Sequence, residues 1–343
     1  MEALKNTLAE NWTGTHNLVS KGHQFDLSSV PDLKGKVAVV TGGSEGIGYG
    51  CTHTLLTHNI SKLFILSMSK AVVDGATDAI RSELGDAAAQ KVRWLQCDLS
   101  DWKATAETAW KISKETDRLD ILINNAGRGI MTRQLASSNG MDLHMATNHF
   151  GHVVLTSHLL PLLKKTADQG SKVRIVNAGS NAHQNAPKEV KFESVEELNK
   201  NYGPNEQYGR SKLAAILYSR YLARHLKISH PNILVNVYHP GVVETRQSSE
   251  HILEPYPLAG YAMKIGLAPF KKGQFEGAVS AMFAATVTEK SGQYICPPAI
   301  PEDGSEQSQN KELGEALMKL TGDVVQSKTA ELSSAKGCPF RDH

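Results

Sequence analysis

From residue 36 onward, short runs of aliphatic and β-branched residues alternate with longer stretches of helical periodicity. This alternation is typical of a parallel sheet with helices on both faces, because each parallel connection carries the chain back across the sheet. We therefore predict an α/β fold built on one doubly wound, seven-stranded parallel sheet. The predicted strands are residues 36–41, 62–67, 91–96, 119–124, 172–177, 232–238 and 292–296. The predicted helices are residues 46–58, 71–84, 102–116, 141–165, 207–228 and 274–286.

Two segments fall outside this alternation. Residues 1–35 are predicted to form an N-terminal arm that lies on the domain. Residues 297–343 are predicted to form a C-terminal extension, with one modest helix near residues 311–320 and a partly mobile end. The predicted sheet domain therefore spans residues 36–296. Right-handed connections place the carboxyl ends of its strands along one edge, where ligands of such sheets bind.

Charge and cysteine content argue against several classes of partner. The 37 basic and 35 acidic residues are well mixed, so the chain has no single-sign field that would attract nucleic acid or an anionic membrane. No apolar run approaches the roughly 20 residues that span a bilayer, and no signal peptide is evident. The four cysteines are far apart and form no CxxC pair, which argues against a zinc site and a disulfide framework. We expect a soluble, cytoplasmic protein, for which a homodimer is a compatible assembly.

A glycine-rich turn, TGGSEGIG, follows the first predicted strand and leads into a helix. Gly42, Gly46 and Gly48 lack a Cβ atom, so the backbone can turn sharply and approach a pyrophosphate, to which the helix amino terminus offers N–H donors. Ser44 and Ile47, in the same turn, are further predicted cofactor contacts. The alternative is a tight connection that binds nothing. The spacing TGxxxGxG resembles the fingerprint of the short-chain dehydrogenase/reductase family, which implies a Rossmann-type domain.

Two further motifs extend this resemblance. The fourth predicted strand ends in NNAG, and in the family Asn125, Ala126 and Gly127 line the cofactor cleft. Asp98 and Leu99 follow the third strand, where family members hold the adenine with an aspartate side chain and the next backbone group. Asp98 has a second interpretation as the N-cap of the following helix, since aspartate is a preferred capping residue.

The sequence YGRSK, near the start of a predicted helix, places a phenol and an ammonium group one turn apart on the same face. A free tyrosine has a pKa of about 10, and a nearby positive charge favours its phenolate. Lys212 provides that charge, so Tyr208 can donate a proton to a developing alkoxide and accept one in the reverse direction. In the family the lysine also hydrogen-bonds the nicotinamide ribose. The alternative is a pair of solvated side chains on one helix face.

The resemblance adds two residues to the predicted catalytic set. The fifth strand ends in RIVNAGS, and Ser180 aligns with the family serine that hydrogen-bonds the substrate oxygen and orients the tyrosine. Gly179 stands where family members often have a second serine. Asn148 takes the position of the family asparagine, whose backbone holds a water that passes protons from the lysine to solvent. Taken alone, an asparagine inside a helix is a surface residue or marks a local kink.

The segments NHFGH and YHPG, with a long stretch between the serine and the tyrosine, resemble the branch of retinol dehydrogenases and WW-domain oxidoreductases. This resemblance covers residues 36–296. It implies cofactor contacts in the segment after the sixth strand, at Pro240, Gly241, Val243 and Thr245. We expect neither the membrane anchor of many retinol dehydrogenases nor a WW domain, so those substrate roles do not transfer.

The end of the second predicted strand bears on which dinucleotide is used. Enzymes of this type that prefer NAD(H) commonly have an acidic residue there, which binds the adenosine ribose and repels a 2′-phosphate. This chain has no carboxylate at that place, whereas Ser67, Ser69 and Lys70 offer hydrogen-bond donors and a positive charge. We expect NADP(H) as the cofactor, with NAD(H) as the alternative.

Histidines are numerous, and four of them, His144, His149, His152 and His158, are close together in the sequence. No HExxH motif or paired carboxylate accompanies them, so they lack the ligand spacing of a metal site. We expect no metal.

Apolar residues recur between residues 245 and 275, a region that family members use as a mobile lid over the substrate. Two helices packed on the core would show the same spacing. We predict a carbonyl reductase or alcohol dehydrogenase that acts with NADP(H) on a lipophilic ketone, aldehyde or alcohol, for example a secondary metabolite, a retinoid or a steroid-like molecule. The alternatives are an NAD-dependent alcohol dehydrogenase of the same fold and a catalytically silent dinucleotide-binding protein. The complete catalytic set favours an enzyme.

Overall fold

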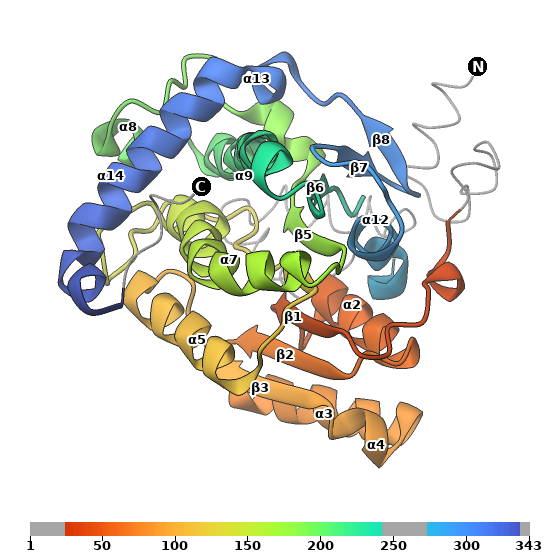
Figure 1. Ribbon diagram of the computed structural model, residues 1–343. Helices are drawn as coiled ribbons and strands as arrows, with labels where there is room; N and C mark the ends of the chain where they lie inside the picture. Colours follow the sequence, from red (N-terminus) through yellow and green to blue (C-terminus); the bar gives the residue numbers. More distant parts are fainter. Residues whose placement is uncertain (1–24, 242–272, 337–343) are drawn as a thin grey trace, which may run out of the picture.

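The computed structural model describes residues 25–241 and 273–336. These residues build one eight-stranded sheet in the order β3-β2-β1-β4-β5-β6-β7-β8 (Figure 1). Strands β1 to β7 pair in parallel, and β8 runs antiparallel to β7. The strands are β1 (Val37–Thr41), β2 (Lys62–Ser67), β3 (Val92–Gln96), β4 (Ile121–Asn124), β5 (Val173–Ala178), β6 (Ile233–Tyr238), β7 (Tyr294–Cys296) and β8 (Ile300–Glu302). The predicted α/β fold is confirmed, and all seven predicted strands are present with bounds within two residues.

The predicted strand number is wrong by one, because β8 adds an antiparallel edge strand. This strand lies in the segment 297–343, which the sequence pattern places outside the sheet. Its register pairs Cys296 with Ile300 directly after the turn. Pro301 lacks an N–H donor, so in a sequence it argues against a strand, but an edge strand tolerates it.

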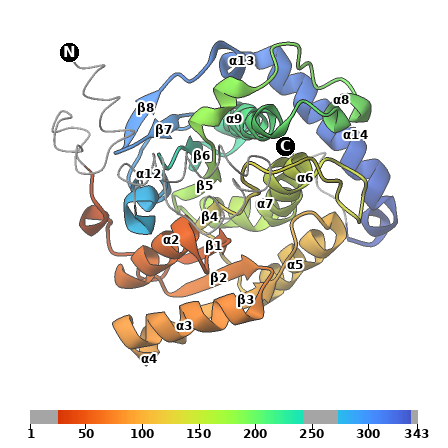
Figure 2. The same cartoon turned by 180° about the vertical axis from the view of Figure 1, so that it is seen from behind.

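Helices cover both faces of the sheet (Figures 1 and 2). Both faces are therefore apolar, as in other sheets of parallel strands. One face carries α2 (Gly46–Thr57), α3 (Lys70–Leu84) and α12 (Gln274–Thr286), and the other carries α5 (Trp102–Glu115), α7 (His152–Asp168) and α9 (Pro204–Ser229). The shorter helical segments are η3 (Leu27–Ser29), α4 (Asp86–Ala89), α6 (Leu143–Met145), the π-helix η4 (Ala146–Gly151), η5 (Asn181–Asn185), α8 (Val195–Asn199) and α13 (Glu306–Gln309).

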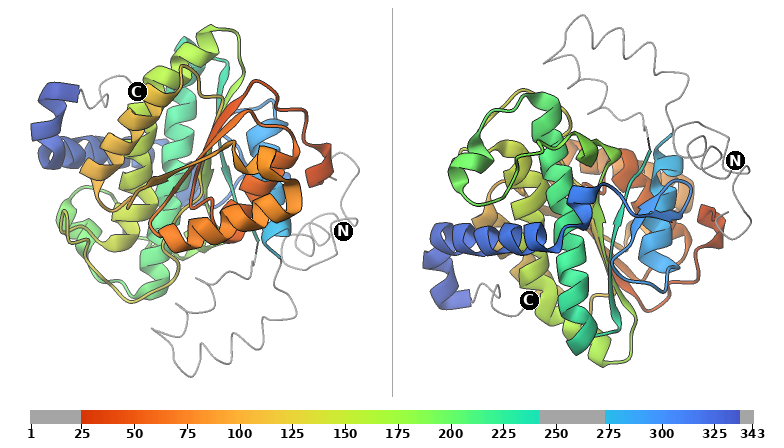
Figure 3. Two further views of the ribbon diagram at one scale, coloured as in Figure 1. Left: turned by 90° about the horizontal axis from the view of Figure 1, so that it is seen from below. Right: turned by 90° about the horizontal axis from the view of Figure 1, so that it is seen from above.

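The last helix, α14 (Lys311–Lys336), is much longer than the modest helix predicted near residues 311–320. It crosses the outer side of α9 and reaches α5 (Figure 3). Leu317, Met318, Val324 and Val325 bury their side chains on its inner side. Threonine, glycine, aspartate and valine in its middle are weak helix formers, so tertiary packing rather than local propensity extends the helix.

The strand order changes direction between β1 and β4, whose register pairs Val40 with Ile123. Doubly wound sheets bind their ligands at such a point, outside the carboxyl ends of the strands. The glycine turn follows β1 and the NNAG segment follows β4. The fold therefore brings the two predicted cofactor motifs together at this edge.

Candidate active site

The glycine turn after β1 allows a close approach to the backbone. Gly42 and Gly46 have φ angles of +63° and +56°, a region that favours glycine. A Cβ atom on Gly48 would lie 2.0 Å from the carbonyl oxygen of Gly42 and 2.5 Å from Nδ2 of Asn125. Helix α2 begins at Gly46, so its first N–H groups lie in the turn, where Ser44 is also buried. These features fit a dinucleotide pyrophosphate, which needs unobstructed backbone donors at a helix amino terminus.

Thr41, at the end of β1, joins this turn to the segment after β4. Its Oγ1 accepts hydrogen bonds of 2.9 Å from the backbone N–H groups of both Asn125 and Ala126. Nδ2 of Asn125 donates to the carbonyl oxygen of Thr41 at 2.9 Å, and the hydroxyl of Tyr238 donates to Oδ1 of Asn125 at 2.8 Å. Sequence reasoning missed the roles of Thr41 and Tyr238, although both belong to motifs that it quoted.

The four predicted catalytic residues lie together at this edge. Ser180 is close enough to the partly exposed Tyr208 to lower the pKa of its phenol, and Nζ of Lys212 is 5.6 Å from the centroid of the Tyr208 ring. Lys212 also donates to the carbonyl oxygen of Ala178 at 2.9 Å. A Cβ atom on Gly127 would lie 2.9 Å from Oδ1 of Asn148 and 3.7 Å from Nζ of Lys212, so both side chains approach the last glycine of NNAG.

Burial changes the proton affinity of the two ionisable groups. It raises the pKa of Tyr208, and the hydrogen bond with Ser180 partly opposes that rise. It lowers the pKa of Lys212 to about 8, because the ammonium group loses solvation. At neutral pH the structure therefore holds a protonated tyrosine beside a charged lysine, the arrangement that proton donation to a carbonyl oxygen requires.

Asn148 lies in the π-helical segment η4, between α6 and α7. The predicted continuous helix over residues 141–165 is therefore interrupted here, and π-helical turns are frequent at functional sites. Oδ1 of Asn148 accepts from the backbone N–H of Arg128 at 2.6 Å, and its Nδ2 donates to the carbonyl oxygen of Arg128 at 3.0 Å and to Oγ of Ser211 at 2.9 Å. The buried side chain thus fixes the segment after β4 to helix α9, where the tyrosine and the lysine lie.

His152 is a further residue of this site that sequence reasoning did not assign. Its Nε2 lies 3.0 Å from Oγ1 of Thr41, and its Nδ1 lies 3.3 Å from the carbonyl oxygen of Asn148. A carbonyl only accepts, so Nδ1 carries the proton, and Nε2 accepts from the threonine hydroxyl. Burial lowers the pKa of His152 to about 4, which keeps the ring neutral. His152 therefore connects the glycine turn to the backbone of Asn148.

The residues predicted to recognise the adenosine phosphate have protein partners. Oγ of Ser67 accepts from the indole N–H of Trp94 at 3.2 Å. Ser69 is the N-cap of α3. Lys70 pairs with Asp74 at 2.6 Å on an exposed face of that helix. The amino terminus of α3 thus lies directly after β2, and the serine hydroxyls remain as donors beside it.

Asp98 does not cap the helix that follows it. Its Oδ1 accepts from the N–H and the hydroxyl of Ser100, at 2.9 and 2.8 Å, whereas Asp101 is the N-cap of α5. The capping interpretation of Asp98 is therefore wrong. The backbone of Leu99 packs against Gly151, where a Cβ atom would lie 2.2 Å from the carbonyl oxygen of Leu99.

The other predicted cofactor contacts are only partly described. Ile47 is partly buried against the apolar layer that contains α2. Pro240 and Gly241 follow β6, and the N–H of Gly241 donates to Nδ1 of His239 at 3.4 Å. Val243 and Thr245 lie outside the described residues, as does the predicted lid at 245–275 apart from its last three positions.

The histidines considered above for metal binding make other contacts. His144 donates to the carbonyl oxygen of Gly129 at 2.9 Å, and His149 contacts Oγ1 of Thr321 at 2.8 Å. Burial lowers the pKa of His149 to about 3. Within residues 25–241 and 273–336, no three metal-ligating side chains are grouped as a metal ion would need.

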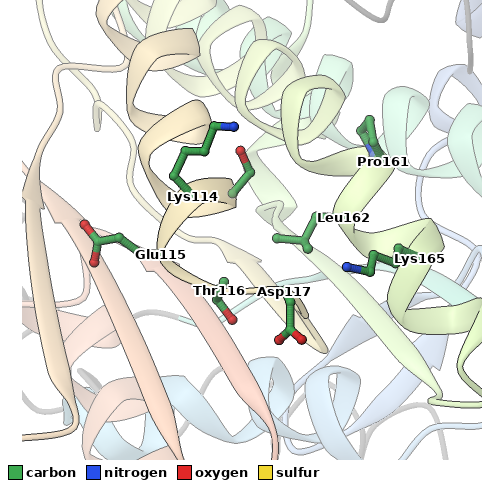
Figure 4. Close-up of a pocket in the computed structure, with 8 residues that line it drawn as sticks. Lys114, Glu115, Thr116, Asp117, Pro161, Leu162 and Lys165 are labelled. Carbon is green, nitrogen blue, oxygen red and sulfur yellow. The ribbon is translucent and has the colours of Figure 1, made fainter.

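An open hollow of about 620 Å³ lies on the opposite side of the sheet domain, near the amino ends of the strands (Figure 4). Its lining comes from the end of α5, the loop before β4 and the second half of α7, and includes Lys114, Thr116, Pro161 and Lys165. This place adjoins the amino end of β4, whereas the catalytic residues lie at the carboxyl edge. The hollow is therefore separate from the candidate active site.

Comparison with known proteins agrees with this geometry. The family model described as short chain dehydrogenase matches residues 36–254. The oxidoreductase bli-4 of Neurospora crassa, which is named as mitochondrial, is 53% identical over 100% of this chain and 84% of its own length. The polyprenol dehydrogenase of Homo sapiens is 31% identical over 76% of this chain and 76% of its own length.

Solved structures share the fold. A crystal structure of a protein from Mycobacterium paratuberculosis has a TM-score of 0.67 at 22% identity and covers 88% of this chain and 97% of its own. The active-site complex of Pseudomonas aeruginosa RhlG with NADP has a TM-score of 0.58 at 26% identity and covers 80% of this chain and 98% of its own. In the described part of the chain, no helix is long and apolar enough to cross a membrane.

Proposed function

Since this chain belongs to the short-chain dehydrogenase family and is an NAD(P)-dependent oxidoreductase, we propose that it uses NADP(H) to interconvert a lipophilic carbonyl compound and its alcohol. The observation that carries the proposal is the group formed by Ser180, Tyr208 and Lys212 beside the glycine turn. A silent binding protein would not need an ionisable phenol held beside a buried ammonium group.

Each catalytic side chain has a role that follows from its surroundings. The nicotinamide, when bound, supplies or accepts the hydride. Tyr208 provides the proton for the oxygen that becomes an alkoxide in the reduction, and its raised pKa keeps that proton in place beforehand. Ser180 orients the phenol and donates to the same oxygen. Lys212 stabilises the phenolate that remains after the proton has left.

The proposed preference for NADP(H) is supported by the end of β2. Ser67, Ser69 and Lys70 lie there without a carboxylate among them, at the amino terminus of α3. A helix amino terminus with hydroxyl donors favours a 2′-phosphate. RhlG, a structural neighbour, forms a complex with NADP. The alternative cofactor is NAD(H).

The proposed lipophilic substrate is supported by one relative. The human enzyme at 31% identity is named for a polyprenol, which is a long isoprenoid alcohol. Polyprenols, retinoids, steroid-like molecules and lipophilic secondary metabolites share a hydroxyl or carbonyl group on an apolar body. Such a molecule would present one polar group to Tyr208 and Ser180 and leave the rest in an apolar environment.

The proposed compartment is the cytoplasm, in agreement with free, buried cysteines at positions 51, 97 and 296. The name of bli-4 favours mitochondria as the alternative. The chemistry proposed here is the same in either compartment.

The function is tested by following nicotinamide absorbance with purified protein and a panel of lipophilic ketones, aldehydes and alcohols. We expect consumption of NADPH with at least one carbonyl compound, and a higher kcat/KM with NADPH than with NADH. The variant Ser67→Asp should shift that ratio toward NADH, because a carboxylate repels the 2′-phosphate and accepts from the ribose.

Ser113→Asp, at the far hollow, is the matched control for an added carboxylate and should leave the cofactor ratio unchanged. A wild-type preference for NADH would contradict the cofactor proposal. Tight cofactor binding without turnover across the whole panel would instead support the silent binding protein.

The reduction is expected to slow as the pH rises through about 8, the value to which burial lowers the pKa of Lys212. Above that pH Lys212 loses its charge, so the phenolate of Tyr208 loses the neighbouring cation that stabilises it. Because this pKa is that of the free enzyme, kcat/KM should approach about a tenfold decrease per pH unit above it. Lys212→Arg stays charged, so its residual activity should lack this decline. A wild-type profile that is flat from about pH 6 to pH 10 would show that the charge of Lys212 is not required.

A further inference from the structure

The short helix η5 follows Ser180 directly and packs against the catalytic helix α9. The hydroxyl of Ser180 accepts from the backbone N–H of Ala182 at 3.1 Å, so the serine is the N-cap of η5. On the other side, a Cβ atom on Gly209 would lie 2.6 Å from the carbonyl oxygen of Ala182 and 2.9 Å from the backbone nitrogen of Ala186. Gly209 is the neighbour of Tyr208. The position of η5 therefore sets the position of Ser180 relative to Tyr208.

His183, in the middle of η5, is fully buried and has a fixed tautomer. Its Nδ1 lies 2.7 Å from the carbonyl oxygen of Ser180, and its Nε2 accepts from the backbone N–H of Ser305 at 3.0 Å. A backbone N–H only donates, so Nε2 has no proton, and Nδ1 must carry it to donate to the carbonyl. The ring also makes an edge contact with Tyr294, at 5.3 Å between centroids. One side chain thus joins Ser180 to the segment after β8.

That segment is itself held in place. Arg220 of α9 donates to the carbonyl oxygens of Ser308 at 2.8 Å and Asp303 at 2.7 Å. Ser305 is the N-cap of α13. Gly304 has a φ of +74°, and a Cβ atom there would lie 2.7 Å from Oγ of Ser308 and 3.3 Å from Nε2 of His183. The backbone N–H that faces His183 is therefore part of a well-anchored loop.

We propose that His183 is a positioning residue of the active site, which fixes Ser180 to the C-terminal segment Asp303–Ser308 through two hydrogen bonds. This inference rests on the proposed function, because Ser180 matters only if its hydroxyl serves the reaction. It gives this segment, which joins β8 to α13, a role in catalysis, although none of its residues is among the catalytic residues. His183 contacts the backbone of Ser180 and not the reacting atoms.

The test uses variants of His183 that remove its two hydrogen bonds separately. His183→Asn keeps a donor near the Nδ1 position and loses the acceptor for Ser305, whereas His183→Gln keeps an acceptor near Nε2 and loses the donor to Ser180. His183→Ala loses both. We expect kcat to fall about tenfold to a hundredfold in the alanine variant and by less in the other two, since a small displacement of a catalytic group has effects of this size. The dissociation constant of NADPH should stay unchanged in all three variants.

His158→Ala is the matched control, because His158 makes the same kind of bond, from Nδ1 to the carbonyl oxygen of Val154 at 2.9 Å, inside α7. It should lower the melting temperature and leave kcat unchanged. The inference is overturned if His183→Ala changes kcat no more than this control, or if kcat and NADPH binding fall together.

The nitrogen chemical shifts of His183 provide a readout without turnover. They should show protonated Nδ1 and unprotonated Nε2 in the wild type, and the opposite tautomer would overturn the inference. If the wild type reduces no compound of the panel while these shifts are as expected, the proposed function fails and the hydrogen-bonded connection stands.

Discussion

Replacement of Tyr208 by phenylalanine should remove most of the turnover and leave cofactor binding intact. The change deletes only the hydroxyl, which is the proton source in the proposed reduction, and keeps the ring that lies 5.6 Å from Nζ of Lys212. Positioned acid and base groups contribute roughly 10²-fold to 10⁴-fold to a rate, and kcat should fall within that range. The measurement is steady-state kinetics at saturating NADPH, with the dissociation constant of NADPH determined separately by fluorescence titration.

Tyr218→Phe is the matched control, because Tyr218 is a buried tyrosine of the same helix α9 and lies outside the catalytic group. It should retain the kcat of the wild type. Near-normal turnover in Tyr208→Phe would mean that another group supplies the proton. A large rise in the dissociation constant of NADPH in that variant would mean that the hydroxyl serves the cofactor rather than the reaction.

The variant Gly48→Ala is expected to weaken the binding of NADPH strongly. The new Cβ atom would lie 2.0 Å from the carbonyl oxygen of Gly42 and 2.5 Å from Nδ2 of Asn125, so the backbone of the turn or of the NNAG segment must move. Overpacking of this kind costs roughly 1–3 kcal/mol, and here the displaced groups are the ones proposed to surround the pyrophosphate. We expect the dissociation constant of NADPH to rise at least about tenfold and the melting temperature to fall.

Gly75→Ala provides the comparison, because Gly75 is an exposed residue of α3 and its added Cβ would meet nothing within 4 Å. It should leave NADPH binding unchanged and stabilise the protein by about 0.5–1 kcal/mol, since alanine is the better helix former. Wild-type affinity for NADPH in Gly48→Ala would show that the cofactor does not depend on this turn.

The predicted strands agree with the structure because their signal is local. Buried parallel strands need nearly continuous aliphatic runs, and such runs occur at β1, β2, β4, β5 and β6. The C-terminal segment carries no comparable signal. Strand β8 has three residues, one of them Pro301, and α14 contains weak helix formers in its middle. Strand β8 forms because it pairs with β7, and α14 extends because it packs on α9. No local pattern in residues 297–336 reveals these two partners.

The residues of the candidate site divide in the same way. The glycine turn, NNAG, Ser180 and the pair Tyr208 and Lys212 stand in contiguous motifs, which the resemblance to a known family makes recognisable. The residues that hold these motifs in place do not belong to such motifs. His152 connects Thr41, which precedes the glycine turn, to Asn148 in η4. Thr41 and His152 lie far apart in the sequence, so no local pattern predicts this contact.

The sequence by itself determined the doubly wound sheet, the edge at which the cofactor motifs lie and the side chains proposed as catalytic. These properties follow from periodicity and from short motifs, which are read within a few residues. Only the tertiary structure decided the eighth strand, the extent of α14 and the hydrogen bonds of the buried histidines around the candidate site. His183 shows the reason, since it joins Ser180 to Ser305, more than a hundred residues away. A histidine's tautomer and its partners depend on which backbone groups the fold brings to its two nitrogens, and that is settled only when distant segments pack together.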